Sequence, residues 1–341
     1  MKTEQQEIMT KEDLKYIIPG DSTTVWYGQR TLNVMGKLHY MKIVTNAYKD
    51  ITRFYKKALK EKECYYGPFK GEFGHFLLHN LPFLMHLYNQ GVKINYCGLE
   101  LHRSFLVNDK GESIIHQWFP LRDFFAETPP RANEVQPPAD VQQKIDEFHT
   151  IAQKSGKAYL NIADKDMYWF VFRNWQLKKG RQYVYSLENV YKNAKENSCV
   201  IFPRKKGNKT VTPNNGAPWD YIGIARLVAP YFDKVYITGH PSMSAELQSE
   251  GNIEVCLSAD NKVVIEKCCN ANLIITQHSG AVHIGAYTNT EVLLIFNGNP
   301  PIKGLIDTLR FRENLTDKPL HYAFTENEIV DFVKQRNEKR S

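Results

Sequence analysis

The sequence predicts an α/β protein of two domains, each built on a parallel sheet with helices on both faces. Its 341 residues exceed the usual size of one domain, so two domains of roughly 150 residues each are expected. Short, uninterrupted apolar runs of strand length alternate with helical patterns, most regularly in residues 199–296. These runs end in polar or glycine-containing turns, and ligands of such sheets bind beyond the carboxyl ends of the strands.

The first domain, residues 1–185, is the less regular of the two. Its expected elements are a helix that opens at 42–48, a strand at 63–66, a helix at 74–90, a strand at 92–96, a helix at 141–154, and strands at 158–162 and 168–172. Residues 108–111 (NDKG) have the chemistry of a hairpin turn between apolar runs at 104–107 and 113–115.

The second domain, residues 186–320, begins with a polar helical stretch at 186–197. Its strands are expected at 199–202, 235–238, 253–255, 273–276 and 292–296, and its helices at 219–232, 244–248, 262–270 and 278–287. The remaining segment, 321–341, holds a helix at 326–335 that we expect to pack back toward the first domain.

The composition is that of a folded protein without a nucleic-acid partner. Hydrophobic residues make up 42% of the chain and charged residues 24%, which argues against wholesale disorder. The net charge is +7, from 44 Lys and Arg against 37 Asp and Glu. The basic clusters at 56–62, 178–181 and 204–206 form no continuous stripe of the kind that nucleic-acid binders use.

Cysteine spacing and hydropathy favour a cytoplasmic protein. The six cysteines show no C-x-x-C spacing and are expected to be reduced thiols. The polar N-terminal sequence MKTEQQEIMTKEDLK lacks the apolar region of a signal peptide. The most apolar stretch, 76–87, is interrupted by histidines, Asn80 and Pro82, and is too short to span a membrane.

Four strand ends of the second domain carry the candidate chemistry, namely 203–207 (PRKKG), 238–241 (TGHP), 277–280 (QHSG) and 297–300 (NGNP). Gly280 permits a tight turn, and the backbone N–H groups at the start of the following helix favour an anion. Ser279 and His283 add side-chain donors. Arg204 and Lys205 offer the positive charge that stabilises a diphosphate leaving group.

The second domain resembles the donor-binding half of the lipopolysaccharide heptosyltransferases and related GT-B glycosyltransferases. The resemblance lies in PRKKG, in APWDYIGIARLVAPYFDKVYITGHP and in LIITQHSGAVHIGAYTNTEVLLIFNG. In that family the Ser-Gly turn and its helix hold the donor diphosphate, and a basic residue after the first strand contacts it. The resemblance therefore implies donor-binding roles for Arg204, Lys205, Thr238, Gly239, His240, His278, Ser279, Gly280 and His283.

Two departures from the family pattern leave the donor open. His240 replaces a small residue in the Thr-Gly-x-Pro turn, and the resulting His-Pro pair resembles the nucleotide-contacting His-Pro of sialyl- and Kdo-transferases. The last strand ends in Phe296-Asn297-Gly298, where the family has Phe-Gly.

Residues 71–82 (GEFGHFLLHNLP) resemble the acceptor side of another group of GT-B-like glycosyltransferases. An inverting transferase needs a general base that deprotonates the acceptor hydroxyl, and Glu72 or His75 is the candidate.

These resemblances imply two Rossmann-like domains that face a cleft, the GT-B architecture. They imply a metal-independent enzyme, without a cofactor, that moves a sugar from a nucleotide-sugar donor to a glycan or glycolipid in lipopolysaccharide or surface polysaccharide synthesis. A peripheral contact with a membrane stays open.

Two alternatives remain. Asp164 and Asp166 form a D-x-D, the pattern with which metal-dependent GT-A transferases hold Mn²⁺ or Mg²⁺ against a diphosphate. The second alternative is a non-catalytic protein that binds a nucleotide or a glycan. A dehydrogenase or P-loop enzyme is not favoured, because neither G-x-G-x-x-G after a strand nor G-x-x-x-x-G-K-[ST] occurs.

Overall fold

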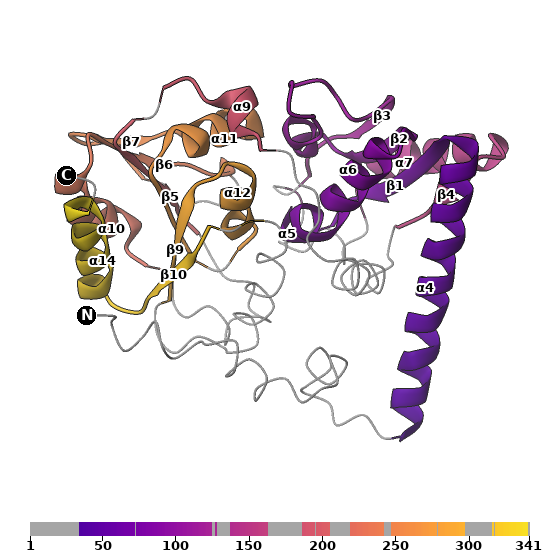
Figure 1. Ribbon diagram of the computed structural model, residues 1–341, viewed down its shortest axis with the longest axis horizontal. Helices are drawn as coiled ribbons and strands as arrows, with labels where there is room; N and C mark the ends of the chain where they lie inside the picture. The colour runs from indigo at the N-terminus through magenta and orange to yellow at the C-terminus, as the bar shows by residue number, and fades with distance from the viewer. Residues whose placement is uncertain are drawn as a thin grey trace.

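Two α/β halves, each with one parallel sheet, make up the structure, which is a computed structural model (Figure 1). It describes residues 34–71, 73–124, 127, 137–162, 186–194, 196–204, 219–241, 247–277, 279–296, 316 and 318–339. We call the described residues up to 162 the N-terminal half and those from 186 the C-terminal half. The α/β fold class predicted from the sequence is confirmed.

The N-terminal half contains a parallel sheet of strand order β3-β2-β1-β4. Its strands are β1 (Glu63–Phe69), β2 (Lys93–Leu99), β3 (Gln117–Leu121) and β4 (Ala158–Leu160). The chain runs from β1 outward to β3 and then returns to place β4 on the other side of β1, so the direction of winding switches between β1 and β4. Ligands of doubly wound sheets bind at such switch points.

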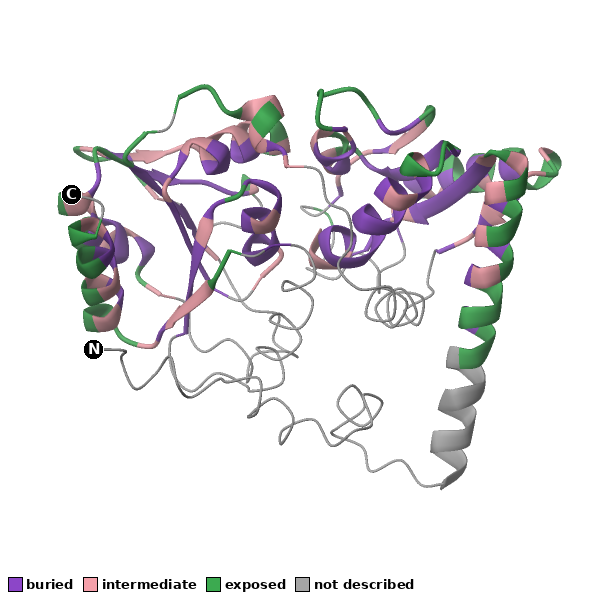
Figure 2. Cartoon of the chain, viewed as in Figure 1, coloured by how far each residue is buried: buried purple, intermediate pink, exposed green. Residues whose placement is uncertain are grey.

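Helices cover both faces of this sheet. They are α4 (Val34–Glu61), α5 (Phe73–His75), the π-helix η1 (Phe76–Asn80), α6 (Leu81–Asn89), the 3-10 helix η2 (Glu100–Phe105) and α7 (Ala139–Lys154). The amphipathic helices turn an apolar stripe to the strands and an exposed face to solvent, as the colours of Figure 2 show for α4 and α7. The α5, η1 and α6 segments follow one another without a break after β1, so the motif at 71–82 leads into a continuous helical run.

The C-terminal half contains a parallel sheet of order β10-β9-β8-β5-β6-β7. Its strands are β5 (Ser198–Phe202), β6 (Lys234–Ile237), β7 (Ile253–Val255), β8 (Leu273–Thr276), β9 (Glu291–Ile295) and β10 (Leu320–Ala323). Numbered from β5 in chain order, the sheet reads 3-2-1-4-5-6 from β7 to β10, which is the classical dinucleotide-fold order. Its switch point lies between β5 and β8.

Helices pack on both faces of the C-terminal sheet. The helices are α9 (Glu188–Tyr191), α10 (Tyr221–Val228), the 3-10 helix η4 (Ala229–Tyr231), α11 (Asn261–Asn270), α12 (Ala281–Tyr287) and α14 (Glu326–Glu338). Helices α10 and α14 share one buried cluster, and α11 and α12 belong to another. Side chains fix where helices start: Asp220 accepts a hydrogen bond from the Gly223 N–H, and Thr325 accepts one from the Glu328 N–H.

The C-terminal helix α14 packs differently from the expectation. Its buried residues Ile329 and Val333 join the core of the C-terminal half, and its main contacts are with α10, η4 and β10. The expected packing toward the first domain is therefore corrected. The reason is that residues 320–323 form a strand parallel to β9, so the helix that follows covers the sheet to which that strand belongs.

The hairpin expected around 108–111 is reduced to an isolated bridge between Val107 and Ser113. Asn108 shapes the turn, because its side-chain oxygen accepts hydrogen bonds from the backbone N–H groups of Lys110 and Glu112 at 2.9 and 3.0 Å. Phe105, expected in the apolar run at 104–107 before the turn, instead ends the 3-10 helix η2. This helical turn buries its ring fully. The strand expected at 168–172 lies outside the described residues.

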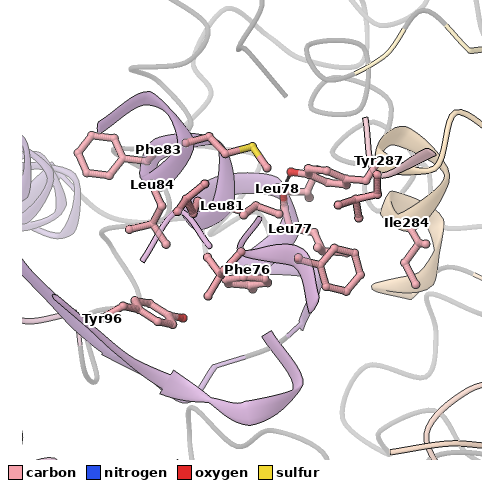
Figure 3. Close-up of a cluster of buried hydrophobic side chains, with 14 of the residues drawn as sticks. Phe76, Leu77, Leu78, Leu81, Phe83, Leu84, Tyr96, Ile284 and Tyr287 are labelled. Carbon is pink, nitrogen blue, oxygen red and sulfur yellow. Dashed lines mark hydrogen bonds between the residues drawn. The ribbon is translucent and has the colours of Figure 1, made fainter. Parts of the chain in front are cut away.

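The two halves are joined by a packed seam. One continuous buried cluster contains Phe76 and Leu77 of the N-terminal half together with Ile284 and Tyr287 of α12, and Figure 3 shows Tyr287 reaching from α12 toward Leu77 and Leu78. The Tyr287 hydroxyl donates to the backbone oxygen of Leu77 across 210 positions of sequence. None of the described helices is long and apolar enough to cross a membrane.

Candidate functional site

The switch point of the C-terminal sheet is bridged by a buried tyrosine. Arg204 follows β5, Gln277 follows β8, and Tyr221 at the start of α10 donates a hydrogen bond to the side-chain oxygen of Gln277. Burial raises the pKa of Tyr221 to about 12, and a hydrogen bond from the Arg204 backbone lowers that pKa in opposition. Tyr221 thus ties the two strand ends together and places half-buried Arg204 beside the switch point.

Ser279 and Gly280 form the turn between β8 and α12. The Ser279 hydroxyl accepts a hydrogen bond from the backbone N–H of Ala281 at 3.3 Å and lies 3.5 Å from the Thr276 hydroxyl. His283, one turn into the helix, is buried with 4% of its surface exposed. These contacts set the start of α12 against the strand end, where the sequence analysis expected the donor phosphates.

The TGHP turn follows β6. Thr238 is buried, and its hydroxyl donates to the Cys256 backbone oxygen at 2.9 Å. Gly239 has φ +150°, a conformation that side-chain-bearing residues rarely adopt. His240 contacts the other half of the molecule, with its Nε2 atom 2.6 Å from Oδ2 of Asp123.

Asp123 is a candidate that the sequence analysis missed. It follows β3 and therefore lies at the carboxyl edge of the N-terminal sheet. The sequence analysis expected no strand at 117–121, so it placed no strand end before Asp123. Lys70, which is 6% exposed and directly follows β1, is a second residue of this kind.

On the acceptor side, the structure describes His75 but not Glu72. His75 is half-buried at the end of α5, and its ring centroid lies 5.8 Å from that of His79. The Asn80 side chain donates to the His75 backbone oxygen at 3.2 Å and accepts from the Tyr66 hydroxyl at 2.5 Å. This buried pair fixes the π-helical turn, a kind of irregularity that is frequent at functional sites.

The acceptor-side and donor-side segments meet at two glycines. A Cβ atom placed on Gly74 would lie 3.4 Å from the Cα atom of Gly280 and 3.7 Å from Cδ2 of His283. The segment after β1 and the segment after β8 are therefore in direct contact. The structure brings Gly74 together with Gly280 and His283 on this side, whereas His240 contacts Asp123.

Several predicted site residues cannot be placed. Glu72, Lys205, His278, Asp164 and Asp166 lie outside the described residues. Among the residues that the structure does describe, no group of three or more His, Cys, Asp or Glu side chains is arranged to hold a metal ion.

Comparisons with known proteins identify similar folds only among solved structures. No family model and no curated protein matches the sequence. The E. coli heptosyltransferase WaaC with ADP is 11% identical, with a TM-score of 0.49, and the match covers 82% of this chain and 99% of that chain. E. coli ADP-heptose lps heptosyltransferase II is 9% identical, with a TM-score of 0.48 and the same coverage, 82% and 99%.

A third solved structure is the glycosyl transferase family 9 protein from Veillonella parvula, which is 14% identical with a TM-score of 0.44 and covers 80% of this chain and 89% of its own. All three solved structures are glycosyltransferases. The chain has an α/β fold of two parallel, doubly wound sheets, and the solved structures similar to it are heptosyltransferases and a family 9 glycosyltransferase.

Proposed function

We propose that this protein is a glycosyltransferase that moves a sugar from a nucleotide-sugar donor to a hydroxyl group of a glycan or glycolipid. The observation that carries the proposal is the contact between Gly74 and Gly280. It joins the segments that follow two central strands, β1 and β8, each beside the switch point of its sheet. Switch points are where doubly wound sheets bind ligands, so two binding edges that meet suit a reaction between two substrates.

The C-terminal half binds the donor in this proposal. Arg204, with Lys205, supplies positive charge at the end of β5, and the N–H groups at the start of α12 face the diphosphate beside Ser279 and Gly280. His278, His283, Thr238 and Gly239 complete the donor side as the resemblance implies. Fixed donors of this kind stabilise the charge that develops on a departing nucleoside diphosphate.

The N-terminal half binds the acceptor. We propose that Glu72 or His75 takes the proton of the acceptor hydroxyl as that oxygen attacks the anomeric carbon of the donor sugar, while the nucleotide leaves. Alanine variants at both positions test this role. A large loss of turnover with unchanged nucleotide affinity identifies the residue as the base. Unchanged turnover shows that the residue is not the base.

Nucleotide binding is the first test of the proposal. The thermal unfolding midpoint is measured with UDP-, GDP-, ADP-, dTDP- and CMP-sugars. A ligand that binds only the native state at about 100 times its Kd adds roughly 2.7 kcal/mol of stability, which shifts the midpoint measurably. The absence of a shift with every donor contradicts the proposal.

A charge placed at the proposed phosphate site tests its location. Ser279→Asp sets a carboxylate beside the start of α12, and we expect nucleotide affinity to fall roughly tenfold or more. Asn193→Asp, at an exposed position elsewhere in the C-terminal half, is the matched control and keeps the parent affinity. Equal affinities in the two variants place the phosphates elsewhere.

We further propose metal-independent chemistry and a cytoplasmic location, in lipopolysaccharide or surface polysaccharide synthesis. Transfer is expected to persist in EDTA. Loss of transfer in EDTA, with recovery on addition of Mn²⁺, favours the metal-dependent alternative in which Asp164 and Asp166 hold the ion.

A further inference from the structure

Turns from the two halves of the chain meet through the side chains of Asp123 and His240. Asp123 follows β3 and His240 follows β6, so each lies at the carboxyl end of a parallel strand. Their Oδ2 and Nε2 atoms are 2.6 Å apart, with 30% and 21% of the respective side chains exposed. Both side chains are therefore partly shielded from water.

The turn that carries His240 is anchored within its own half by other atoms. The Thr238 hydroxyl donates to the Cys256 backbone oxygen, and the Gly239 backbone oxygen accepts from the Ser258 N–H, each at 2.9 Å. These bonds fix the backbone of the turn on the C-terminal sheet. The His240 side chain then connects this fixed turn to the N-terminal half.

Arg122, next to Asp123 in the chain, contacts two other carboxylates and the Asp123 backbone oxygen. Arg122 contacts Asp140 through Nε at 2.6 Å and Glu127 through Nη2 at 3.1 Å. Between the two halves, the Asp123 carboxylate contacts the His240 ring, with Oδ2 and Nε2 2.6 Å apart.

We propose that His240 is a positioning residue: its partner is Asp123, and the pair sets the TGHP turn of the donor half against the acceptor half. The inference rests on the proposed function and deepens it. It gives the histidine that departs from the heptosyltransferase pattern a protein partner in place of a nucleotide contact. In this proposal the histidine at position 240 aligns the two halves. Its presence therefore does not indicate which nucleotide the donor carries.

Exchanging Asp123 and His240 distinguishes a positioning role of His240 from a direct contact with the nucleotide. Affinities for ADP, UDP, GDP, dTDP and CMP are measured for His240→Asp, for Asp123→His and for the double variant, all in the full chain. His240→Asp alone places two carboxylates together, and we expect roughly tenfold weaker binding of the preferred nucleotide; the double variant restores the pair and returns to within about threefold of the parent. An aspartate that faced the nucleotide would repel its phosphates in both variants, so a double variant no better than His240→Asp overturns the proposal.

Unfolding without any nucleotide provides a second measurement. The free energies of unfolding of His240→Ala, Asp123→Ala and the double variant are expected to be non-additive, by roughly two- to tenfold in the unfolding constant, because the second truncation has no contact left to break. If the changes in the free energy of unfolding of the two single variants add up to that of the double variant, the proposed contact is wrong. If no nucleotide binds the parent protein, the proposed function fails while this measurement still decides on the contact.

The control pair is Lys262 and Glu266, which lie one turn apart on α11 with their charged atoms 3.9 Å apart. Both side chains are exposed and belong to a single helix, so their alanine variants remove an ion pair without touching the contact between the halves. These variants are expected to keep the nucleotide affinity of the parent.

Discussion

Gly280 lies against Gly74 so closely that a Cβ atom on Gly280 would be 2.9 Å from the backbone nitrogen of Gly74 and 3.1 Å from Cδ1 of Phe73. The two glycines bring the start of α12 onto α5, and the seam between the halves continues from there to Leu77 and Tyr287. Side-chain-free backbone is therefore what lets the candidate donor and acceptor segments touch.

Gly280→Ala is expected to destabilise the protein by about 1–3 kcal/mol, since the added methyl meets backbone atoms that cannot move independently. Chemical denaturation measures the effect. Gly74→Ala is the matched control, because its Cβ would make an ordinary contact at 3.4 Å. Equal stability of the two variants would contradict the close approach.

Tyr221→Phe is expected to weaken nucleotide binding and to lower stability by about 1–3 kcal/mol. The phenylalanine removes the hydroxyl that bonds to buried Gln277, and the strand ends after β5 and β8 lose their bridge. Nucleotide titration and denaturation are measured together.

The control for this variant is Tyr191→Phe. Its hydroxyl donates to the Ser104 backbone oxygen at the seam, at 3.0 Å, so its loss costs stability without disturbing the strand ends. If both variants lowered nucleotide affinity equally, the bridging role of Tyr221 would be refuted.

Glu291 is expected to make stability depend on pH in the acidic range. The His321 ring, 3.4 Å away, and then Arg336, which donates a hydrogen bond at 2.6 Å, lower its pKa from 4.5 to about 2. Because the folded-state pKa is depressed, the stabilisation is complete above about pH 4.5 and is lost as the pH falls toward 2. Glu291→Gln should abolish this part of the pH dependence, which denaturation curves at a series of acidic pH values detect. If stability of the Gln variant depended on acidic pH as it does in the parent, other carboxyl groups would be responsible for that dependence.

His102 is expected to stay neutral in the folded protein. It is fully buried, stacks on Phe76 with ring centroids 3.9 Å apart, and shares a 3.0 Å hydrogen bond with the Tyr96 hydroxyl. Burial lowers its pKa from 6.5 to about 3. The unfolded chain takes up a proton below about pH 6.5 while the folded chain does not, so stability falls as the pH drops through this window. An NMR titration in which the His102 ring titrates near its ordinary pKa would contradict the burial.

Local sequence patterns predicted the class of the fold and most of its elements. Apolar runs of strand length and helical periodicity are local patterns, and they predicted strands such as 199–202 and 273–276 within one residue of β5 and β8. The same local rules identified the turn at Ser279 and Gly280. They predicted no strand at 117–121, so Asp123 after β3 was not identified.

The tertiary structure alone decided which of these local features meet. Nothing near Gly280 in the sequence shows that Gly74 lies against it, and nothing near His240 shows that its partner is Asp123. The packing of the helix at 326–338 was predicted wrongly for the same reason. An amphipathic pattern shows that one face of a helix is buried, but it does not specify which element covers that face. Periodicity and turn chemistry act over a few residues, whereas contacts between the halves depend on how two finished sheets pack together.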